Sequence, residues 1–142
     1  MDERIIIEGI GANTRVELSE SLTGTRTQGI ESFMMTLTTE GMQITRRVHL
    51  CSVYEVQGLA DFFSGLAQGG KFAASGKTWE TIEEDFKLSC KCDRQGRFLL
   101  TFDIRTVSFP SGYPSWTLRF TIELEPGQMA SLGSGVRDFC RL

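Results

Sequence analysis

The most regular alternation in the chain runs through residues 116–125, which read WTLRFTIELE. Every second residue is apolar, at Trp116, Leu118, Phe120, Ile122 and Leu124, and the residues between them are polar. Successive side chains of a β-strand point to opposite faces, so the pattern predicts a strand with one buried and one solvated face. A sheet of such strands requires a second layer that covers its apolar side.

Upstream segments show the same period of two. They cover residues 4–8, 13–18, 30–38, 42–51, 86–92 and 97–105, with turn-forming residues at 9–11, 40–41 and 93–96. Short connections of this kind favour hairpins and an antiparallel sheet. Residues 79–85 are ambiguous between strand and turn, and Arg46 interrupts the apolar face of residues 42–51. Outward-pointing Arg119 and Glu123 are expected to form an exposed ion pair that contributes little.

Two segments show the helical period instead. Ser52 and Glu55 have the spacing of a capping box, and apolar residues follow at steps of three and four until Gly69-Gly70, which predicts the end of the helix. A second helix is predicted after Pro126, which suits a first helical position. Its apolar positions are Met129, Leu132, Val136 and Phe139, and each of Gly133 and Gly135 weakens it by about 1 kcal/mol relative to Ala.

The order of elements is strands, helix, strands, helix. This order predicts a single α+β domain over residues 1–142, in which a curved, mainly antiparallel sheet packs against two helices. A β-barrel with appended helices is the alternative.

Composition excludes several classes of protein. The chain has 142 residues, of which 40% are hydrophobic and 23% charged, which argues against a disordered or membrane-spanning chain. Its net charge of −3 argues against nucleic-acid and anionic-membrane binding. The start Met-Asp-Glu-Arg lacks the features of a secretion signal, so a cytoplasmic protein with free thiols is expected.

The chain contains few residues of the types that act in catalysis or bind metals. His49 is the single histidine, and it shares the polar side of its predicted strand with Arg47, so a solvated role is expected. Cys90 and Cys92 form a C-x-C pair without further ligand motifs, so we expect a core role and no metal or other cofactor. Residues 70–78 resemble a phosphate loop, but five residues rather than four separate their two glycines, and the segment follows a helix. We therefore expect no catalytic residue.

Two segments are candidates for partner binding. The first is an acidic cluster formed by Glu80, Glu83, Glu84 and Asp85, which would suit a basic protein or a divalent cation. The alternative is a solvated sheet edge that prevents aggregation. The second is the Pro/Gly-rich loop at 107–115, where Phe109 and Tyr113 are candidate anchors, or else close the core.

A set of motifs between residues 33 and 139 is shared with a known family. They are the F-x-x-x-L pattern of Phe33–Leu37, the helix Leu59-x-x-Phe62-Phe63-x-x-Leu66, Trp79-Glu80, Asp85-Phe86-x-Leu88, Trp116 and Glu123-Leu124-Glu125-x-Gly127-Gln128-Met129. Through them the chain resembles a family of small uncharacterised bacterial proteins with a domain of unknown function. The resemblance implies no activity and no catalytic residue. In size and charge the chain is also similar to bacterial immunity proteins, which bind and neutralise a toxin; this is an analogy of type.

The sequence therefore predicts a non-enzymatic protein-binding domain, with a toxin-neutralising immunity protein as its specific version. The alternatives are a small-molecule-binding or enzymatic domain with a pocket in the curved sheet, and a structural subunit that forms a homo-oligomer.

Overall fold

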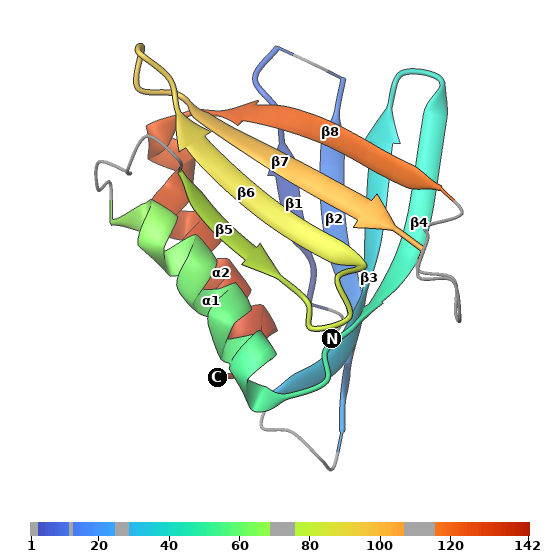
Figure 1. Ribbon diagram of the computed structural model, residues 1–142. Helices are drawn as coiled ribbons and strands as arrows, with labels where there is room; N and C mark the ends of the chain where they lie inside the picture. The colour runs from blue at the N-terminus through green and yellow to red at the C-terminus, as the bar shows by residue number, and fades with distance from the viewer. Residues whose placement is uncertain (1–2, 12, 25–28, 69–75, 107–115) are drawn as a thin grey trace.

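The computed structural model contains two four-stranded antiparallel sheets and two helices (Figure 1), and it describes residues 3–11, 13–24, 29–68, 76–106 and 116–142. The first sheet has the order β1 (Ile5–Glu8), β2 (Arg15–Thr23), β3 (Ile30–Thr39) and β4 (Met42–His49). The second has the order β5 (Lys77–Glu80), β6 (Phe86–Cys92), β7 (Phe98–Arg105) and β8 (Thr117–Leu124). The helices are α1 (Val53–Ala67) and α2 (Met129–Phe139), and a short 3₁₀ turn at Pro126–Gln128 precedes α2.

The predicted α+β class is confirmed. The antiparallel strands divide into two sheets, and neither closes into a barrel within the described residues. The ambiguous segment at 79–85 resolves into the end of β5 followed by a turn. Neither described helix is long and apolar enough to cross a bilayer.

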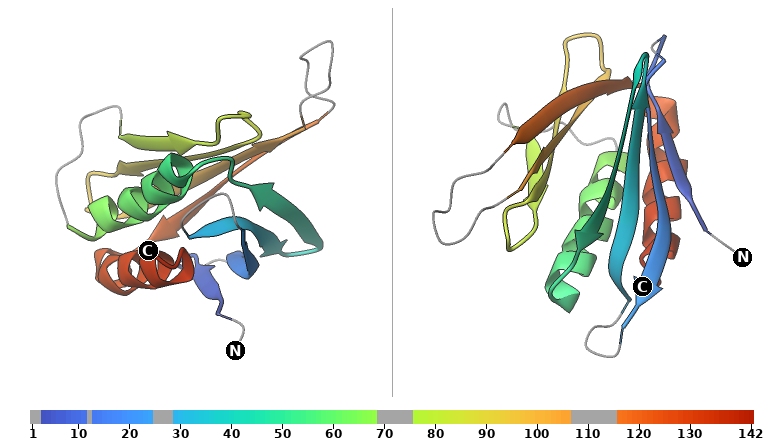
Figure 2. Two further views of the ribbon diagram at one scale, coloured as in Figure 1. Left: turned by 90° about the horizontal axis from the view of Figure 1, so that it is seen from below. Right: turned by 90° about the vertical axis from the view of Figure 1, so that its right-hand side faces the viewer.

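The helices fill the opening between the two sheets on one side of the molecule (Figures 1 and 2). Helix α1 packs beside β5, α2 packs beside β1, and the two helices pack on each other. On the other side, β8 crosses the strands of the first sheet. The Trp116 ring before β8 lies near Arg46 of β4, and the carbonyl of Glu123 near its end accepts a hydrogen bond of 2.9 Å from the Ile10 amide.

Aromatic side chains connect the layers of the core. Phe33 of β3 makes edge-to-face contacts with Phe86 of β6 and with Phe139 of α2, at centroid distances of 6.2 and 6.0 Å. Phe86 in turn contacts Phe102 and Trp79 within its own sheet. Both sheets and one helix therefore meet at a single aromatic cluster, which is where large apolar side chains gain most from burial.

The predicted buried faces are confirmed for most strand positions, but Trp116, Met42 and Cys92 are exceptions. Trp116 is 42% exposed and Met42 is 43% exposed, although their alternation placed both on the inner face. Cys90 is buried, whereas Cys92 at the end of β6 is exposed, so the expected core role is correct for Cys90 only. These residues keep the correct side of the strand but extend past the part of the core that covers it.

Gly133 of α2 lies directly against α1. A Cβ atom at this position would lie 3.0 Å from the Ala67 Cβ and 3.1 Å from the Phe63 carbonyl oxygen. Ala67 and Phe63 belong to a packed interface that cannot shift freely to make room for a side chain. Gly133 therefore lowers the helix propensity of α2 but permits the contact between the two helices.

We expect Gly133→Ala to lower the free energy of unfolding by about 1–2 kcal/mol, because overpacking outweighs the helix propensity gained. Urea denaturation followed by circular dichroism measures the change. Gly127→Ala is the matched control, since a Cβ atom there meets nothing within 4 Å. A Gly133→Ala variant more stable than the wild type would contradict the steric role.

Candidate functional site

The turn at residues 81–85 joins β5 to β6 and is called the acidic turn below. The Glu84 amide donates to the Thr81 carbonyl at 2.9 Å, and the Thr81 amide donates to the Phe86 carbonyl at 3.0 Å, which closes the turn at its base. Glu84 has a φ of 60°, in the left-handed region that favours glycine. The backbone of this turn is therefore tightly folded, although it lies at the surface.

Glu55 holds the acidic turn from the side of α1. The predicted N-cap is confirmed, because the Ser52 hydroxyl accepts from the Glu55 amide at 3.3 Å. The Glu55 carboxylate, however, accepts from the Cys51 amide and from the Ile82 amide, both at 3.0 Å. Glu55 is only 5% exposed, so its side chain fastens the start of the helix to the turn.

Arg46 holds the acidic turn from the side of the first sheet. Its guanidinium donates to Asp85 at 3.2 Å and to the Arg105 carbonyl at 2.8 Å, and it lies 5.5 Å from the centroid of the Trp116 ring. The Thr81 hydroxyl donates to the other Asp85 oxygen at 2.6 Å. Arg46, which interrupts the apolar alternation of β4, thus bridges the two sheets. That interruption was the one sign in the sequence that Arg46 has a structural role.

The four predicted acidic residues lie together but differ in environment. Asp85 is 9% exposed and pairs with Arg46, so it belongs to the fold rather than to the surface. Glu84 forms an exposed ion pair with Arg105 at 3.3 Å. Glu83 accepts a weak contact from the Cys51 thiol at 3.8 Å, and Glu80 is exposed on β5. The other two candidates, Phe109 and Tyr113, lie outside the described residues.

Sequence reasoning missed the apolar side chain at the tip of the turn. Ile82 is 67% exposed, and Glu83 and Glu84 follow it directly. Tyr54, adjacent to Glu55 in the first turn of α1, is 84% exposed. A large aliphatic residue inside a charge cluster was the signal that could have identified the tip.

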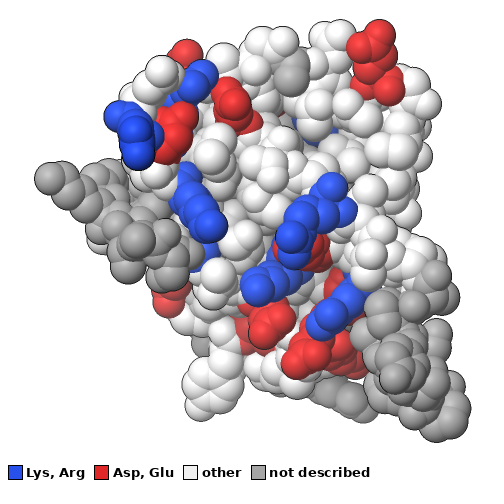
Figure 3. Space-filling view, turned by 45° about the horizontal axis from the view of Figure 1, so that its top comes forward, with Lys and Arg blue, Asp and Glu red and all other residues white. Residues whose placement is uncertain are grey.

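A groove of about 480 Å³ extends from the acidic turn across the outer face of β5–β8. Ile104 and Thr117 line it together with charged residues of both signs, which are Glu80, Glu84, Lys87, Asp103, Arg105 and Arg119. Figure 3 shows acidic and basic side chains alternating on this face. The expected Arg119–Glu123 pair is wrong: Arg119 pairs with Asp103, and Glu123 pairs with Arg97 at 3.2 Å. Residues four apart on a strand are separated by about 13 Å, whereas cross-strand neighbours are adjacent.

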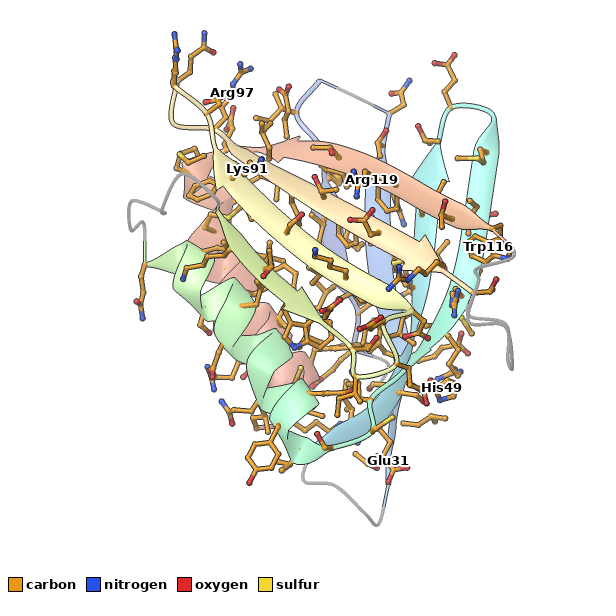
Figure 4. The ribbon with its side chains drawn as sticks, viewed as in Figure 1. Glu31, His49, Lys91, Arg97, Trp116 and Arg119 are labelled. Carbon is orange, nitrogen blue, oxygen red and sulfur yellow. The ribbon has the colours of Figure 1, made fainter. Side chains whose placement is uncertain are left out.

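The other chemically versatile residues are dispersed. Among the described residues, no three His, Cys, Asp or Glu side chains are grouped closely enough to hold a metal ion. His49 is exposed at the end of β4 (Figure 4), as predicted. Lys77 begins a strand, whereas a phosphate loop opens a helix.

The four cysteines divide into two exposed and two buried thiols. Burial raises the pKa of Cys90 to about 12 and that of Cys140 to about 12. Desolvation, followed by the charges of Glu55 and Glu83, raises the pKa of Cys51. Because the thiolate is the reactive form, these environments disfavour nucleophilic chemistry at all three positions.

Removing the Arg46 charge should leave Asp85 desolvated without its partner. We expect Arg46→Gln to reduce the free energy of unfolding by about 2–4 kcal/mol, because Asp85 is largely buried. Combining it with Asp85→Asn should reduce stability by less than the sum of the single changes. Arg4→Gln is the control, since Arg4 is mostly exposed beside Glu17. Equal effects of the two arginine changes in chemical denaturation would refute the bridging role.

Thiol labelling of the native protein should modify the exposed Cys92 readily and the exposed Cys51 more slowly, because the pKa of Cys51 is raised, and it should leave the buried Cys90 and Cys140 intact. Mass spectrometry after mild alkylation, followed by denaturation and a second reagent, distinguishes the two classes. Labelling of Cys140 at the rate of Cys92 in folded protein would contradict this placement.

Comparison with known proteins gives a family but no activity. The model of a family described as "Family of unknown function (DUF6228)" matches residues 8–141. No curated protein and no solved structure shows a significant match. Because the match extends over most of the two sheets and both helices, the chain belongs to this family of unknown function, DUF6228.

Proposed function

We propose that this domain is a non-enzymatic binding module that recognises a protein partner through the acidic turn. The observation that carries the proposal is the exposed Ile82 side chain on a turn that buried polar contacts hold in place. A rigid apolar anchor surrounded by polar groups is the usual arrangement at the centre of a protein–protein interface.

The rigidity of the turn supports binding over simple solvation. Glu55 fixes the Ile82 amide, and Arg46 and Thr81 fix Asp85. A turn that is ordered before binding loses little conformational entropy on association, so more of the contact energy contributes to affinity. A loop that only connects two strands does not require contacts from both α1 and β4.

The backbone at Glu84 supports the same conclusion. A left-handed conformation at a residue other than glycine destabilises the fold by roughly 1 kcal/mol, and glycine would relieve it. Here the position carries an exposed carboxylate that pairs with Arg105 and lines the groove. A charged residue in a strained surface turn favours a role in recognition.

The charges indicate the kind of partner. Glu83 and Glu84 directly follow Ile82, and the chain has a net charge of −3. A basic surface with an apolar cavity for Ile82 would complement this region, and the opposite charges would accelerate association at low salt. Neutralisation of a basic toxin in the manner of an immunity protein is the specific form of the proposal.

Replacing Ile82 with aspartate should weaken partner capture strongly and leave the fold intact. Tagged wild-type and Ile82→Asp proteins are compared by affinity capture from the source organism, and the captured protein is then titrated by calorimetry. We expect at least about a tenfold loss of affinity, as is typical of a central anchor.

Leu22→Asp is the matched control, because Leu22 is 55% exposed but lies on β2 of the other sheet. It should bind the partner like the wild type. A partner that binds Ile82→Asp with wild-type affinity would refute the role of the acidic turn. The same holds if the wild type and Ile82→Asp capture the same set of proteins.

A further inference from the structure

Four charged residues form a single row across the outer face of the second sheet. Glu80 pairs in register with Lys87, Lys87 with Asp103, and Asp103 with Arg119. The row therefore reads negative, positive, negative, positive from β5 to β8. The Arg119 side chain is 76% exposed and that of Asp103 is 26% exposed, so the row faces solvent.

A second row of hydroxyl groups runs beside the charged row. Thr78, Ser89, Thr101 and Thr121 occupy consecutive register positions on β5 to β8. The Thr101 and Thr121 hydroxyls are 2.8 Å apart. Because a hydroxyl both donates and accepts, such a row can pair with an identical row.

This face is available for contact in the described part of the chain. The helices lie on the opposite side of the β5–β8 sheet (Figures 1 and 2), and Figure 4 shows Lys91 and Arg119 on its outward side. A groove of about 350 Å³ adjoins the one described above and is lined by both rows. The face is thus broad, polar and ordered by the strand register.

We propose that this face associates with the same face of a second copy of the chain. A two-fold axis parallel to the strands, passing between β6 and β7, places β5 over the partner's β8 and β6 over the partner's β7. Glu80 then faces the partner's Arg119, and Lys87 faces the partner's Asp103. The hydroxyl row meets the partner's hydroxyl row, so each charge and hydroxyl in these two rows faces a complementary group.

The charges select this axis over the other in-plane two-fold axis. An axis perpendicular to the strands places each strand over its own copy. If this axis runs along the charged row, each charged residue faces the same residue of the second copy. Like charges in contact strongly oppose association. The alternating order of the row is therefore complementary to itself in one orientation only.

The size of the face predicts a weak dimer. Four strands about 4.8 Å apart that average about seven residues in length, at about 3.3 Å per residue, cover roughly 400 Å² on each protomer. This is about half the area of a standard stable interface, and its contacts are polar. Association should therefore be concentration-dependent and should weaken as salt screens the charges.

Two complementary charge reversals test the pairing directly. Sedimentation equilibrium of the wild type should show a monomer–dimer equilibrium whose dissociation constant rises with salt. Glu80→Lys and Arg119→Glu should each weaken self-association by more than about tenfold, because each places two like-charged pairs in the homodimer. An equimolar mixture of the two variants should regain dimers, since the introduced lysine of one variant then faces the introduced glutamate of the other, and the second pair remains native.

Glu40→Lys is the control for Glu80→Lys, because it makes the same charge change on an exposed residue in the turn between β3 and β4. It should dimerise like the wild type, and thermal melts confirm that all variants fold. A wild type that remains monomeric at high concentration and low salt would overturn the proposal. Dimers unaffected by either reversal, or a variant mixture that stays monomeric, would overturn it equally. The mass measurement requires no other protein, so its outcome is independent of the partner proposed for the acidic turn.

Discussion

Each sheet of this domain has one apolar face, and neither face can be left in water. The two faces cover each other where Phe33 of β3 meets Phe86 of β6, and Phe139 brings α2 to the same point. The sheets diverge away from this contact, because β8 crosses the first sheet instead of pairing with it. The helices are required to fill the resulting opening, which explains why α1 follows the first sheet and α2 follows the second. Gly133 matters because both helices must fit into that opening together.

Polar contacts then determine how the second sheet is oriented on the first. Arg46 extends from the inner side of β4 to Asp85, the Arg105 carbonyl and the Trp116 ring, which belong to three segments of the other half of the chain. Apolar packing is non-directional, whereas a guanidinium that donates at 2.8 and 3.2 Å also fixes an orientation. Together with Glu55, this contact converts the β5–β6 connection into a fixed feature. The exposed position of Ile82 is thus a consequence of the same contacts that join the two sheets.

Apolar residues at every second position predicted almost every strand, and apolar residues at steps of three and four predicted both helices. Both patterns depend only on residues that are close in the sequence. The division into two sheets could not be derived in this way, since eight strands joined mostly by short turns give the same pattern in one sheet or in two. Trp116 and Cys92 were assigned to the core because alternation reports the side of a strand but not how far the covering layer extends. Arg46 was noticed as an exception, yet its partner lies 39 residues away, beyond any local rule. The acidic cluster was visible in the sequence, but only the structure separates the buried Asp85 from the exposed Glu83 and identifies the exposed Ile82 beside them.

The acidic turn and the outer face of β5–β8 are adjacent, and their residues are divided between two tasks. Glu84 and Arg105 lie at the boundary, where the turn enters the groove. In the proposed pair, a two-fold axis parallel to the strands keeps both acidic turns at the same end of the dimer and on opposite sides of it. Ile82 belongs to neither of the two paired rows, so dimerisation and partner binding do not use the same residues. A weak dimer would then present two identical turns, and a partner that is itself dimeric or repetitive would be bound more tightly than one turn alone allows. The small polar interface is too weak to give a stable dimer by itself. Through this coupling, the affinity for the partner would rise with the concentration of the domain, because more of it would be dimeric.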